Sequence, residues 1–324
     1  MKFRKLRQME KYLMCILILY IVIVSTASKN FLTVNTLFDL LKTSSGTLIL
    51  ASGVLMVLIS GGIDVSFTAI AVVSGYSSIL LMMNLGVDNI LFALLVAALI
   101  GCFLGVINAL IIHFFKLSTF IVTLGTSNVF YGFMTTFIGT SSISVADKPS
   151  SLFKFGSARL MGLPLFFIIA IVVLSITWFI LYKTTLGRNI FAIGNSEESA
   201  MRVGINILKT KLFIYSYMGL LSGIMGIVYF SEIDLINPIS LVGTELMVIA
   251  AVVIGGIRLT GGEGTILGAI LGVSIIQIFR STLVFLGLST SWNDLFIGII
   301  LIASVSIISY QERKANKKHL IFTK

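Results

Sequence analysis

Charged residues are scarce in this chain of 324 residues, and proline and cysteine are scarcer still. Only 11% of the residues are Asp, Glu, Lys or Arg, against about 25% in a typical soluble domain. A water-soluble protein of this size needs more polar residues to cover its surface, so the composition excludes one. The 3 prolines exclude a proline-rich linker protein. The 2 cysteines, Cys15 and Cys102, lie in apolar runs and exclude a disulfide-stabilised scaffold.

The residue patterns of catalysis and of metal or nucleotide binding are also missing. The sequence has no Gly-x-x-x-x-Gly-Lys-Ser/Thr loop for nucleotide phosphates, no Gly-x-Ser-x-Gly nucleophile turn and no Cys-x-x-Cys pair. The 2 histidines, His113 and His319, lie far apart in the sequence and outside any metal-ligand spacing. We therefore expect that the chain is not an enzyme and that it binds neither a metal nor a cofactor itself.

Apolar residues dominate what is present. They make up 57% of the chain, and the mean hydropathy is +1.08. The apolar segments are long, continuous and without strand-like alternation, so we expect membrane-spanning helices. The sequence predicts an all-α polytopic membrane protein of about ten spans, in which the two shortest segments form short or broken helices. The predicted spans are residues 12–27, 47–60, 67–83, 90–115, 119–138, 163–182, 212–230, 246–257, 265–284 and 293–309.

The basic residues gather in a few segments. With an even number of spans, 17 of the 23 Lys and Arg residues fall on one side of the membrane. Basic residues favour the cytoplasmic side, so we place the N terminus (1–11), the loop 183–211 and the tail (311–324) there. This bias explains the net charge of +10 better than a patch that binds nucleic acid. The whole chain, 1–324, is interpreted as a single transmembrane domain.

Three acidic residues lie close to membrane depth. Asp64 lies between two apolar segments, where an ionised side chain is costly. It either lines a polar pathway at a broken helix or caps the helix that follows, and both roles can hold. Glu245 has the same two interpretations, with a cap or first-turn role favoured. Asp294, which follows Trp292 closely, is expected to open the last helix near the outer interface.

Glycines recur every four residues in three of the segments. Gly264, Gly268 and Gly272 form the longest series, and pairs occur at 101/105 and 219/223. Small residues at this spacing let helices approach closely in lipid. Packing within the chain is the simpler interpretation. The alternatives are a face for a second subunit or the moving wall of a pathway.

The loop 183–211 contains a short amphipathic helix near 195–204. Asn195 or Ser196 caps its start, two glutamates occupy its first turn, and Gly204 ends it. A helix of this kind either lies on the membrane surface or docks into a groove on a cytoplasmic partner. Composition alone does not decide between the two.

Five motifs follow one another along the chain. They are Ser60-Gly61-Gly62-Ile63-Asp64-Val65-Ser66, Asn108-Ala109-Leu110, Lys116-Leu117-Ser118-Thr119-Phe120-Ile121-Val122-Thr123-Leu124-Gly125-Thr126, Leu186-Gly187-Arg188 with Gly194-Asn195, and Glu245-Leu246-Met247-Val248-Ile249-Ala250-Ala251-Val252-Val253-Ile254-Gly255-Gly256 with Leu259-Thr260-Gly261-Gly262-Glu263-Gly264-Thr265. On these motifs, in this order, the chain resembles the permease subunits of bacterial ATP-binding cassette (ABC) importers for simple sugars. It is similar to the ribose and autoinducer-type branch, which is related more distantly to branched-chain amino acid permeases. The likeness runs from about residue 30 to residue 310, although Thr119 stands where a proline is usual and Phe67 replaces a small residue.

The resemblance implies a complex in the bacterial plasma membrane. Two permease subunits, identical or related, form the pathway, and an extracellular or periplasmic binding protein delivers a monosaccharide-type sugar such as ribose. Cytoplasmic ABC ATPase subunits, which bind ATP and magnesium, drive the transport, and nucleic acid plays no part. Residues 195–204 then form the coupling helix that contacts the ATPase. The residues implied to carry the coupling are Asn195, Glu198, Ala200, Arg202 and Gly204.

A sugar pathway in such a permease is expected to be weakly polar, because tight binding would trap the sugar. The candidates to line it are, from their positions alone, Asp64, Asn108, Thr123, Ser127 and Asn128. The competing hypothesis is a secondary transporter driven by protons or sodium, in which Asp64 and Glu245 are the titrating sites.

Overall fold

The computed structural model describes residues 8–27, 31–144, 147–238, 241 and 243–285, with isolated positions between 289 and 302. Eight helices in these ranges are long and apolar enough to cross a membrane. The protein is therefore a polytopic, helical membrane protein, which confirms the predicted fold class. The eight are α1 (Gln8–Ala27), α2 (Val34–Ile59), α3 (Phe67–Asn84), α4 (Ile90–Phe115), α5 (Thr119–Phe133) with the π-helix η1 (Met134–Ile138), α7 (Leu165–Lys183), α10 (Ile207–Glu232) and α12 (Ile266–Phe285).

Shorter elements connect the long helices. A two-residue antiparallel hairpin precedes α7, with Arg159 opposite Pro164 and Leu160 opposite Leu163. The sequence analysis did not predict this hairpin or the helices α6 and α8, because their apolar residues are too few to register as spans. The shorter elements are α6 (Ser150–Ser157), β1 (Arg159–Leu160), β2 (Leu163–Pro164), α8 (Thr185–Asn195), α9 (Glu197–Arg202) and α11 (Glu245–Ile254).

Two of the predicted spans differ from the observed helices in an informative way. Segment 47–60 corresponds to the second half of α2, which begins at Val34. The first half of α2 was not predicted, because its polar residues lower the hydropathy of that segment. Segment 246–257 corresponds to α11, which has 10 residues and stops part-way. The predicted span 293–309 is described only at isolated positions. Asp294, the tail 311–324 and residues 1–7 of the N-terminal segment lie outside the described residues.

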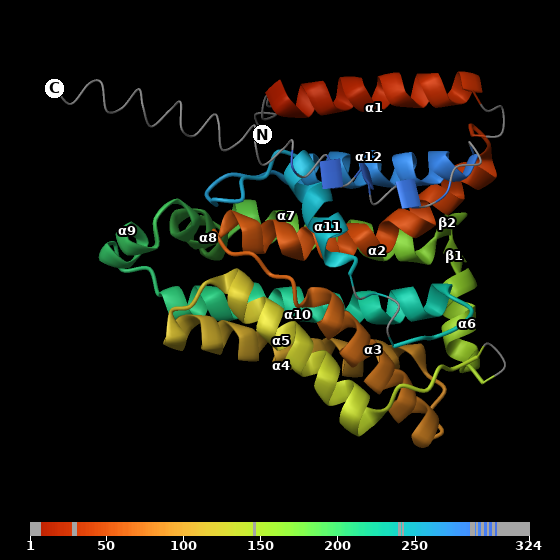
Figure 1. Cartoon of the computed structure of the whole chain (residues 1–324), viewed down its shortest axis with the longest axis horizontal. Coiled ribbons are helices and arrows are strands. Elements are labelled where there is room, and N and C mark those ends of the chain that lie inside the picture. Colours follow the sequence, from red (N-terminus) through yellow and green to blue (C-terminus); the bar gives the residue numbers. More distant parts are fainter. Residues whose placement is uncertain are drawn as a thin grey trace.

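The long helices run side by side between two ends of the molecule (Figure 1). Helices α8 and α9 lie at one end, at the left of the view, together with the connections from α2 to α3 and from α11 to α12. The β1–β2 hairpin and α6 lie at the opposite end. The basic loop 183–211 thus belongs to the α8–α9 end, which is the end that the distribution of Lys and Arg assigns to the cytoplasm.

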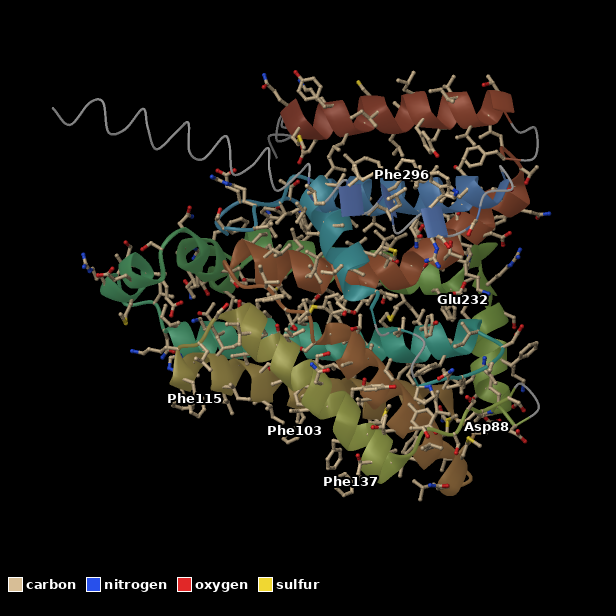
Figure 2. All side chains as sticks on the ribbon, in the orientation of Figure 1. Asp88, Phe103, Phe115, Phe137, Glu232 and Phe296 are labelled. Carbon is tan, nitrogen blue, oxygen red and sulfur yellow. The ribbon has the colours of Figure 1, made fainter. Side chains whose placement is uncertain are left out.

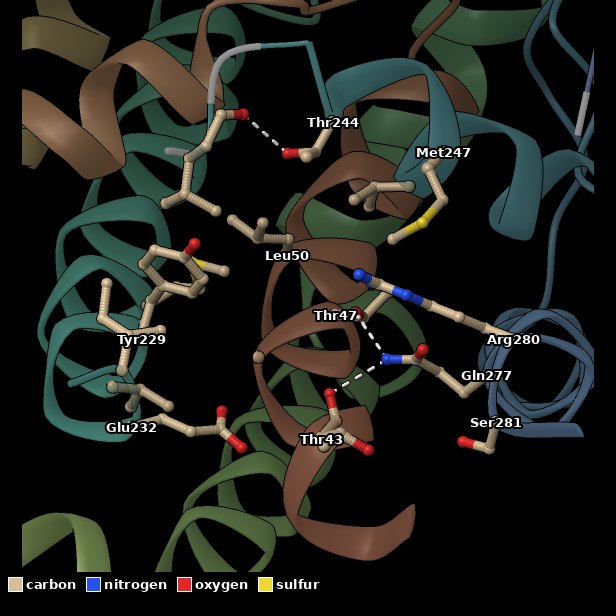
Figure 3. A pocket seen from close by; sticks show the side chains of 16 residues that line it. Thr43, Thr47, Leu50, Tyr229, Glu232, Thr244, Met247, Gln277, Arg280 and Ser281 are labelled. Atoms are coloured by element: carbon tan, nitrogen blue, oxygen red, sulfur yellow. Dashed lines mark hydrogen bonds between the residues drawn. The ribbon is translucent and has the colours of Figure 1, made fainter. Parts of the chain in front are cut away.

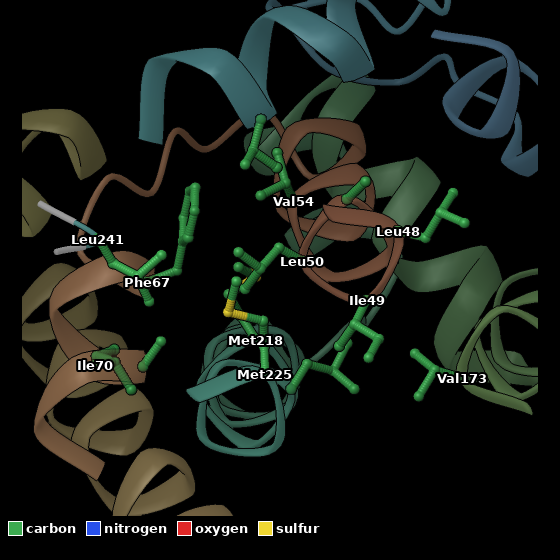
Figure 4. Close-up of a cluster of buried hydrophobic side chains, with 14 of the residues drawn as sticks. Leu48, Ile49, Leu50, Val54, Phe67, Ile70, Val173, Met218, Met225 and Leu241 are labelled. Carbon is green, nitrogen blue, oxygen red and sulfur yellow. The ribbon is translucent and has the colours of Figure 1, made fainter. Parts of the chain in front are cut away.

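The centre of the protein is an apolar core between α2, α3 and α10. In Figure 4, Leu50 and Val54 of α2 meet Phe67 of α3 and Met218 and Met225 of α10. Phe67, which departs from the family pattern, is fully buried here. Its ring is therefore part of the packing between helices, and nothing in its position exposes it to a passing solute.

The outer surface of the bundle is apolar as well. Phe103 and Phe115 of α4 and Phe137 of η1 point away from the other helices (Figure 2), and each is more than 60% exposed. Helix α1 lies at the edge of the bundle, next to α12 (Figure 1). Large exposed apolar side chains over whole helices are the surface that a lipid bilayer requires.

Polar contacts fasten α6 at the end opposite α8 and α9. The Asp88 carboxylate accepts hydrogen bonds from the Ser150 hydroxyl at 2.5 Å and from the Ser151 N–H at 2.9 Å. These bonds favour the ionised carboxylate and lower the pKa of Asp88 to about 2. The Lys148 ammonium donates to the carbonyls of Ser231 and Ile233, both at 3.1 Å, at the C-terminal end of α10.

Glycines bring α4 and α10 into backbone contact. An ideal Cβ on Gly219 would lie 2.1 Å from the carbonyl oxygen of Gly101, and one on Gly101 would lie 2.2 Å from that of Gly219. The next glycine on α4, Gly105, faces the carbonyl oxygen of Tyr215 at 2.1 Å in the same way. Only hydrogen side chains fit between the two helices, so the four-residue glycine spacing serves close packing within the chain.

We expect Gly219→Ala to lower the thermal unfolding midpoint of the purified protein in detergent. Its methyl group would overlap the Gly101 carbonyl, and overpacking of this kind costs about 1–3 kcal/mol. The matched control is Gly125→Ala on α5, where nothing lies within 4 Å of an added Cβ and alanine favours the helix. Equal midpoints for the two variants would contradict the backbone contact.

Candidate functional site

Residues 60–66 break the path of the chain between α2 and α3. The chain turns at Gly61, whose φ is +81°, and then runs without regular secondary structure until α3 begins at Phe67. Two α5 hydroxyls accept backbone hydrogen bonds from this segment: Ile63 N–H donates to Thr119 Oγ1 at 2.9 Å, and Val65 N–H donates to Thr123 Oγ1 at 3.2 Å. The hydroxyls replace the partners that a continuous helix would supply, which allows a break among apolar helices.

Asp64 lies in this segment and organises the start of α3. One of its carboxylate oxygens, Oδ1, accepts from the Ser66 N–H at 2.7 Å and from the Ser66 hydroxyl at 2.6 Å. The Asn108 amide on α4 donates to the Ser66 hydroxyl oxygen at 2.7 Å. Asp64, Ser66 and Asn108 are all buried, at 3%, 0% and 0% exposure. The carboxylate therefore holds Ser66, the N-cap residue of α3, through both of its hydrogen bonds and does not bond to the first-turn N–H groups of the helix.

A second break, between α10 and α11, meets the first. The chain leaves α10 at Glu232 and returns toward the centre of the bundle, where α11 begins at Glu245 (Figure 1). The Glu245 carboxylate accepts from the Gly243 N–H at 3.0 Å and from the Thr68 hydroxyl in the first turn of α3 at 3.1 Å. Glu245 is thus a first-turn residue, as favoured from the sequence. It joins the N termini of two helices that enter from opposite ends of the molecule.

The geometry suits a gate. Each helix N terminus carries partial positive charge, and Asp64 and Glu245 place a carboxylate at each of them. Both helices start inside the bundle, so a small shift of either helix start moves a helix end within the apolar interior. Within the described ranges no group of three His, Cys, Asp or Glu residues is placed to hold a metal ion.

The structure assembles three of the five candidate pathway residues. Asp64, Asn108 and Thr123 belong to the hydrogen-bond network of the first break. Ser127 is half-buried on α5 and takes no part in that network, and Asn128 is exposed, with its amide donating to Leu124 O of its own helix at 2.9 Å.

Sequence reasoning missed three polar residues of the two breaks. Ser66, Thr68 and Thr119 make the hydrogen bonds that hold the helix ends, but none of them was a candidate. A signal was available for Thr119, because a hydroxyl in place of the usual proline adds an acceptor beside the first break. No comparable signal identifies Thr68, whose partner lies 177 residues away in the sequence.

The loop 183–211 contains two helices instead of one. Helix α9 (Glu197–Arg202) begins at Ser196, whose hydroxyl accepts from the Ser199 N–H at 3.2 Å, and the chain reverses at Gly204, whose φ is +85°. Asn195, offered as a cap for this helix, is instead the last residue of α8, and its amide donates to Phe191 O at 2.8 Å. The predicted short helix exists, with its cap at the second of the two proposed positions.

Helix α9 presents one side to its own chain and another to the surroundings. Ala200 is buried, together with Ile193 and Ile207. Met201 and Val203 are 60% and 76% exposed. Ala200 therefore packs against its own chain, and the apolar residues of this part of the chain that are open to a partner are Met201 and Val203.

Ion pairs hold the polar side of α9. Glu198 and Arg202 pair one turn apart and are largely exposed. Glu197 pairs with Lys211 on α10 at 2.8 Å, which ties α9 to the start of a long helix.

Glycines join α8 to the first break and to the α11–α12 connection. An ideal Cβ on Gly194 would lie 1.8 Å from Ile59 O and 2.6 Å from Gly262 N, and these two atoms are themselves hydrogen-bonded at 2.8 Å. Gly261, whose φ is +90°, lies against Gly61 in the same place. Residues 59–61, 194 and 261–262, which we call the glycine junction, therefore bring the end of α8, the first break and the α11–α12 connection into backbone contact.

Two of the predicted packing glycines lie on α12, and Gly264 lies just before it. An ideal Cβ on Gly268 would lie 2.1 Å from Gly255 O, and one on Gly272 would lie 1.9 Å from Ala251 O. Gly264 faces the side chain of Ile59 at 2.8 Å. These glycines thus pack α12 against α11 and the end of α2 within one chain.

Comparison with known proteins identifies relatives along almost the whole chain. Residues 36–305 match the family model described as "Branched-chain amino acid transport system / permease component". The ribose import permease protein of Escherichia coli (strain K12) is 32% identical over 308 residues, 94% of this chain and 95% of that protein. The D-allose transport system permease protein of the same strain is 31% identical over 283 residues, 87% and 86% of the two chains. The autoinducer 2 import system permease protein of Photorhabdus luminescens is 31% identical over 283 residues, 87% and 84%. No solved structure matches the chain significantly.

We expect Asp64→Ala to destabilise the protein more than Asp64→Asn does. Alanine leaves the buried N–H and hydroxyl of Ser66 without their acceptor, which costs about 1–3 kcal/mol. Asparagine keeps an oxygen in that position. Thermal unfolding in detergent measures the difference, with Asn128→Ala as a control at an exposed amide. This role of Asp64 is refuted if the alanine and asparagine variants unfold together.

Proposed function

The chain belongs to the branched-chain amino acid transport system permease family, and on that premise we propose that it carries a monosaccharide-sized sugar, of the ribose kind, across the membrane. As a member, it is a multi-pass membrane subunit of a bacterial ABC importer and has a transport role instead of a catalytic one. The sugar, the partner proteins and the mechanism below are parts of the proposal.

The observation that carries the choice of a sugar is the likeness to three import permeases. Their names specify ribose, D-allose and autoinducer 2, which are small and rich in oxygen, and each likeness spans more than four-fifths of both chains. The interior of this chain supports the choice, because its buried polar groups are mainly hydroxyls and amides. Such groups exchange hydrogen bonds with a neutral polyol without holding a charge.

The mechanism that we propose is alternating access driven from the cytoplasm. An ABC ATPase, which binds ATP and magnesium, docks on α9, and the closing of its two halves displaces that helix. The glycine junction passes the displacement to residues 60–66 and to the α11–α12 connection, because backbone atoms in direct contact leave no side chain to absorb the motion. The helix ends held by Asp64 and Glu245 then shift together.

Two further partners belong to the proposal. The acids of the breaks are engaged in holding helix ends, so they offer the sugar little affinity. An external sugar-binding protein therefore captures the sugar from dilute solution. A second permease subunit, identical or related, completes the pathway.

The test of this function is uptake by the complete importer in proteoliposomes. We expect ATP inside the vesicles to drive accumulation of radiolabelled D-ribose or D-allose in the presence of the binding protein. Met201→Asp should abolish both ATPase binding and uptake, because it places a charge on the exposed apolar side of α9. The matched control is Met161→Asp, at a 97% exposed residue of the opposite hairpin, which should behave as wild type.

Two results would overturn the proposal. One is accumulation of solute against a gradient by the chain alone, dissipated by an uncoupler while ATP is maintained, which would establish a secondary transporter. The other is ATP-driven uptake of an amino acid by a complex that takes up no sugar.

We expect Gly194→Ala to uncouple transport from ATP hydrolysis. Its methyl group would collide with Ile59 O and break the hydrogen bond from Gly262 N, which separates α8 from the first break and from the α11–α12 connection. ATP hydrolysis should continue while sugar carried per ATP falls at least about tenfold, a barrier change of about 1.4 kcal/mol. Simultaneous measurement of phosphate release and uptake checks this.

Two controls accompany that variant. Gly125→Ala, at an open position of α5, should keep the wild-type ratio. Asn195→Ala removes a side chain that packs on Gly262 without adding a clash and should give a smaller loss. A Gly194→Ala importer with the wild-type ratio would show that the junction transmits nothing.

A further inference from the structure

A cavity of about 540 Å³ lies between α2, α10, α11 and α12 (Figure 3). It is separate from the network of Asp64, Asn108 and Thr123, none of which lines it. Its walls come from the halves of α2, α10 and α12 away from the α8–α9 end, and the start of α11 closes it at Thr244. Its volume falls within the range of about 300–1,000 Å³ that is typical of small-molecule sites.

Two opposite charges face this cavity without pairing. Glu232 comes from α10 and Arg280 from α12, on opposite walls in Figure 3. Among the described residues, neither side chain has an ion-pair or hydrogen-bond partner, although the charge of Lys42 also acts on Glu232. Glu232 is half-buried at the last residue of α10, and Arg280 is exposed on α12, so both charges are open to a solute that enters the cavity.

Neutral hydrogen-bonding groups line the wall between these charges. The Gln277 amide donates one hydrogen to Thr43 O at 2.9 Å and the other to Thr47 Oγ1 at 3.1 Å. Both of its hydrogens are then used, and its oxygen remains as an acceptor at the cavity. Gln277 is 5% exposed and held by two bonds, so this acceptor is fixed in place. Tyr229 adds an aromatic ring to the facing wall.

We propose that this cavity binds a neutral monosaccharide on its way to the helix breaks, an inference that rests on the proposed function. The sugar's hydroxyls donate to the Glu232 carboxylate and the Gln277 oxygen, and they accept from the Arg280 guanidinium. A polyol carries donors and acceptors on adjacent carbons, which matches acceptors and a donor on facing walls. The cavity binds the sugar with low affinity after the binding protein has released it, because few of the lining groups are charged.

The alternative ligand is a zwitterionic amino acid, with its carboxylate at Arg280 and its ammonium at Glu232. The binding of such a ligand depends on both charges and gains little from Gln277. The neutral wall of Thr43, Thr47 and Gln277 favours the sugar. The difference gives the two ligands opposite mutational signatures.

The experiment measures protection of a cysteine at the cavity. Ser281→Cys is introduced into a chain with Cys15→Ser and Cys102→Ser, assembled in the complete importer, and alkylated by a membrane-impermeant maleimide from the binding-protein side. We expect D-ribose or D-allose at millimolar concentration to slow alkylation at least about fivefold and L-leucine to leave it unchanged. Met161→Cys, outside the cavity, should be alkylated at one rate with or without sugar.

Second-site variants then identify the groups that bind. Gln277→Leu should raise the sugar concentration for half protection at least about tenfold, the effect of losing one good hydrogen bond to a fixed acceptor. Glu232→Gln and Arg280→Gln keep hydrogen-bonding atoms and should raise it less. Protection by L-leucine that disappears in these two charge variants would overturn the proposal in favour of the amino acid.

The outcome for this site is distinguishable from that for the proposed function. If the importer accumulates D-ribose or D-allose with ATP but neither sugar protects Ser281→Cys, the cavity is not a sugar site and the function stands. If the importer accumulates no sugar at all, the proposed function fails, and the sugar site fails with it.

Discussion

The central constraint on this structure is that every backbone group at a helix break needs a partner inside an apolar bundle. Continuous helices satisfy their own N–H and C=O groups, but a chain that opens at residues 60–66 and again before Glu245 must find substitutes. The substitutes are side chains. The hydroxyls of Thr119 and Thr123 come from a distant part of the sequence, and the carboxylates of Asp64 and Glu245 each accept an N–H from a residue two positions away. The breaks can exist only because these groups are in place, and the route of the chain through the middle of the membrane follows from them.

Glycine solves the complementary problem of bringing backbones together. Between α4 and α10 the contacts of Gly101 and Gly219 run along two long helices and fix them rigidly. At the glycine junction the same kind of contact joins short segments, so that the end of α8 touches both the first break and the α11–α12 connection. Close packing of this kind transmits a displacement instead of absorbing it. Glycine therefore serves both to pack two long helices closely and to bring short connecting segments into backbone contact.

The sequence predicted the spans well because hydropathy reports burial in lipid directly. It predicted the short helix before Gly204 because capping residues act locally: Ser196 and two glutamates are enough to start a helix. It did not predict the first half of α2 or helix α8, where polar residues on helices weaken the apolar signal. The partnership of Thr68 with Glu245 and the contact of Gly194 with Ile59 also escaped, because a sequence read alone carries no information on contacts across long separations. Ala200 shows a further limit, since an apolar residue on a short helix packs either inward or outward, and here it packs inward.

The polar groups of the two breaks and those of the cavity differ in whether they already have hydrogen-bond partners. At the breaks, Asp64 and Glu245 are bonded to the helix ends that they hold, so a solute that reaches them meets groups already engaged. In the outer cavity, Glu232 and Arg280 have no such partners among the described residues. If the chain carries a sugar as proposed, the sugar gains hydrogen bonds in the cavity and gains few at the breaks, so the breaks act as the barrier of the proposed pathway. In the proposed mechanism this barrier is lowered by moving the helix ends, and the segments that would move them meet at the glycine junction next to α9.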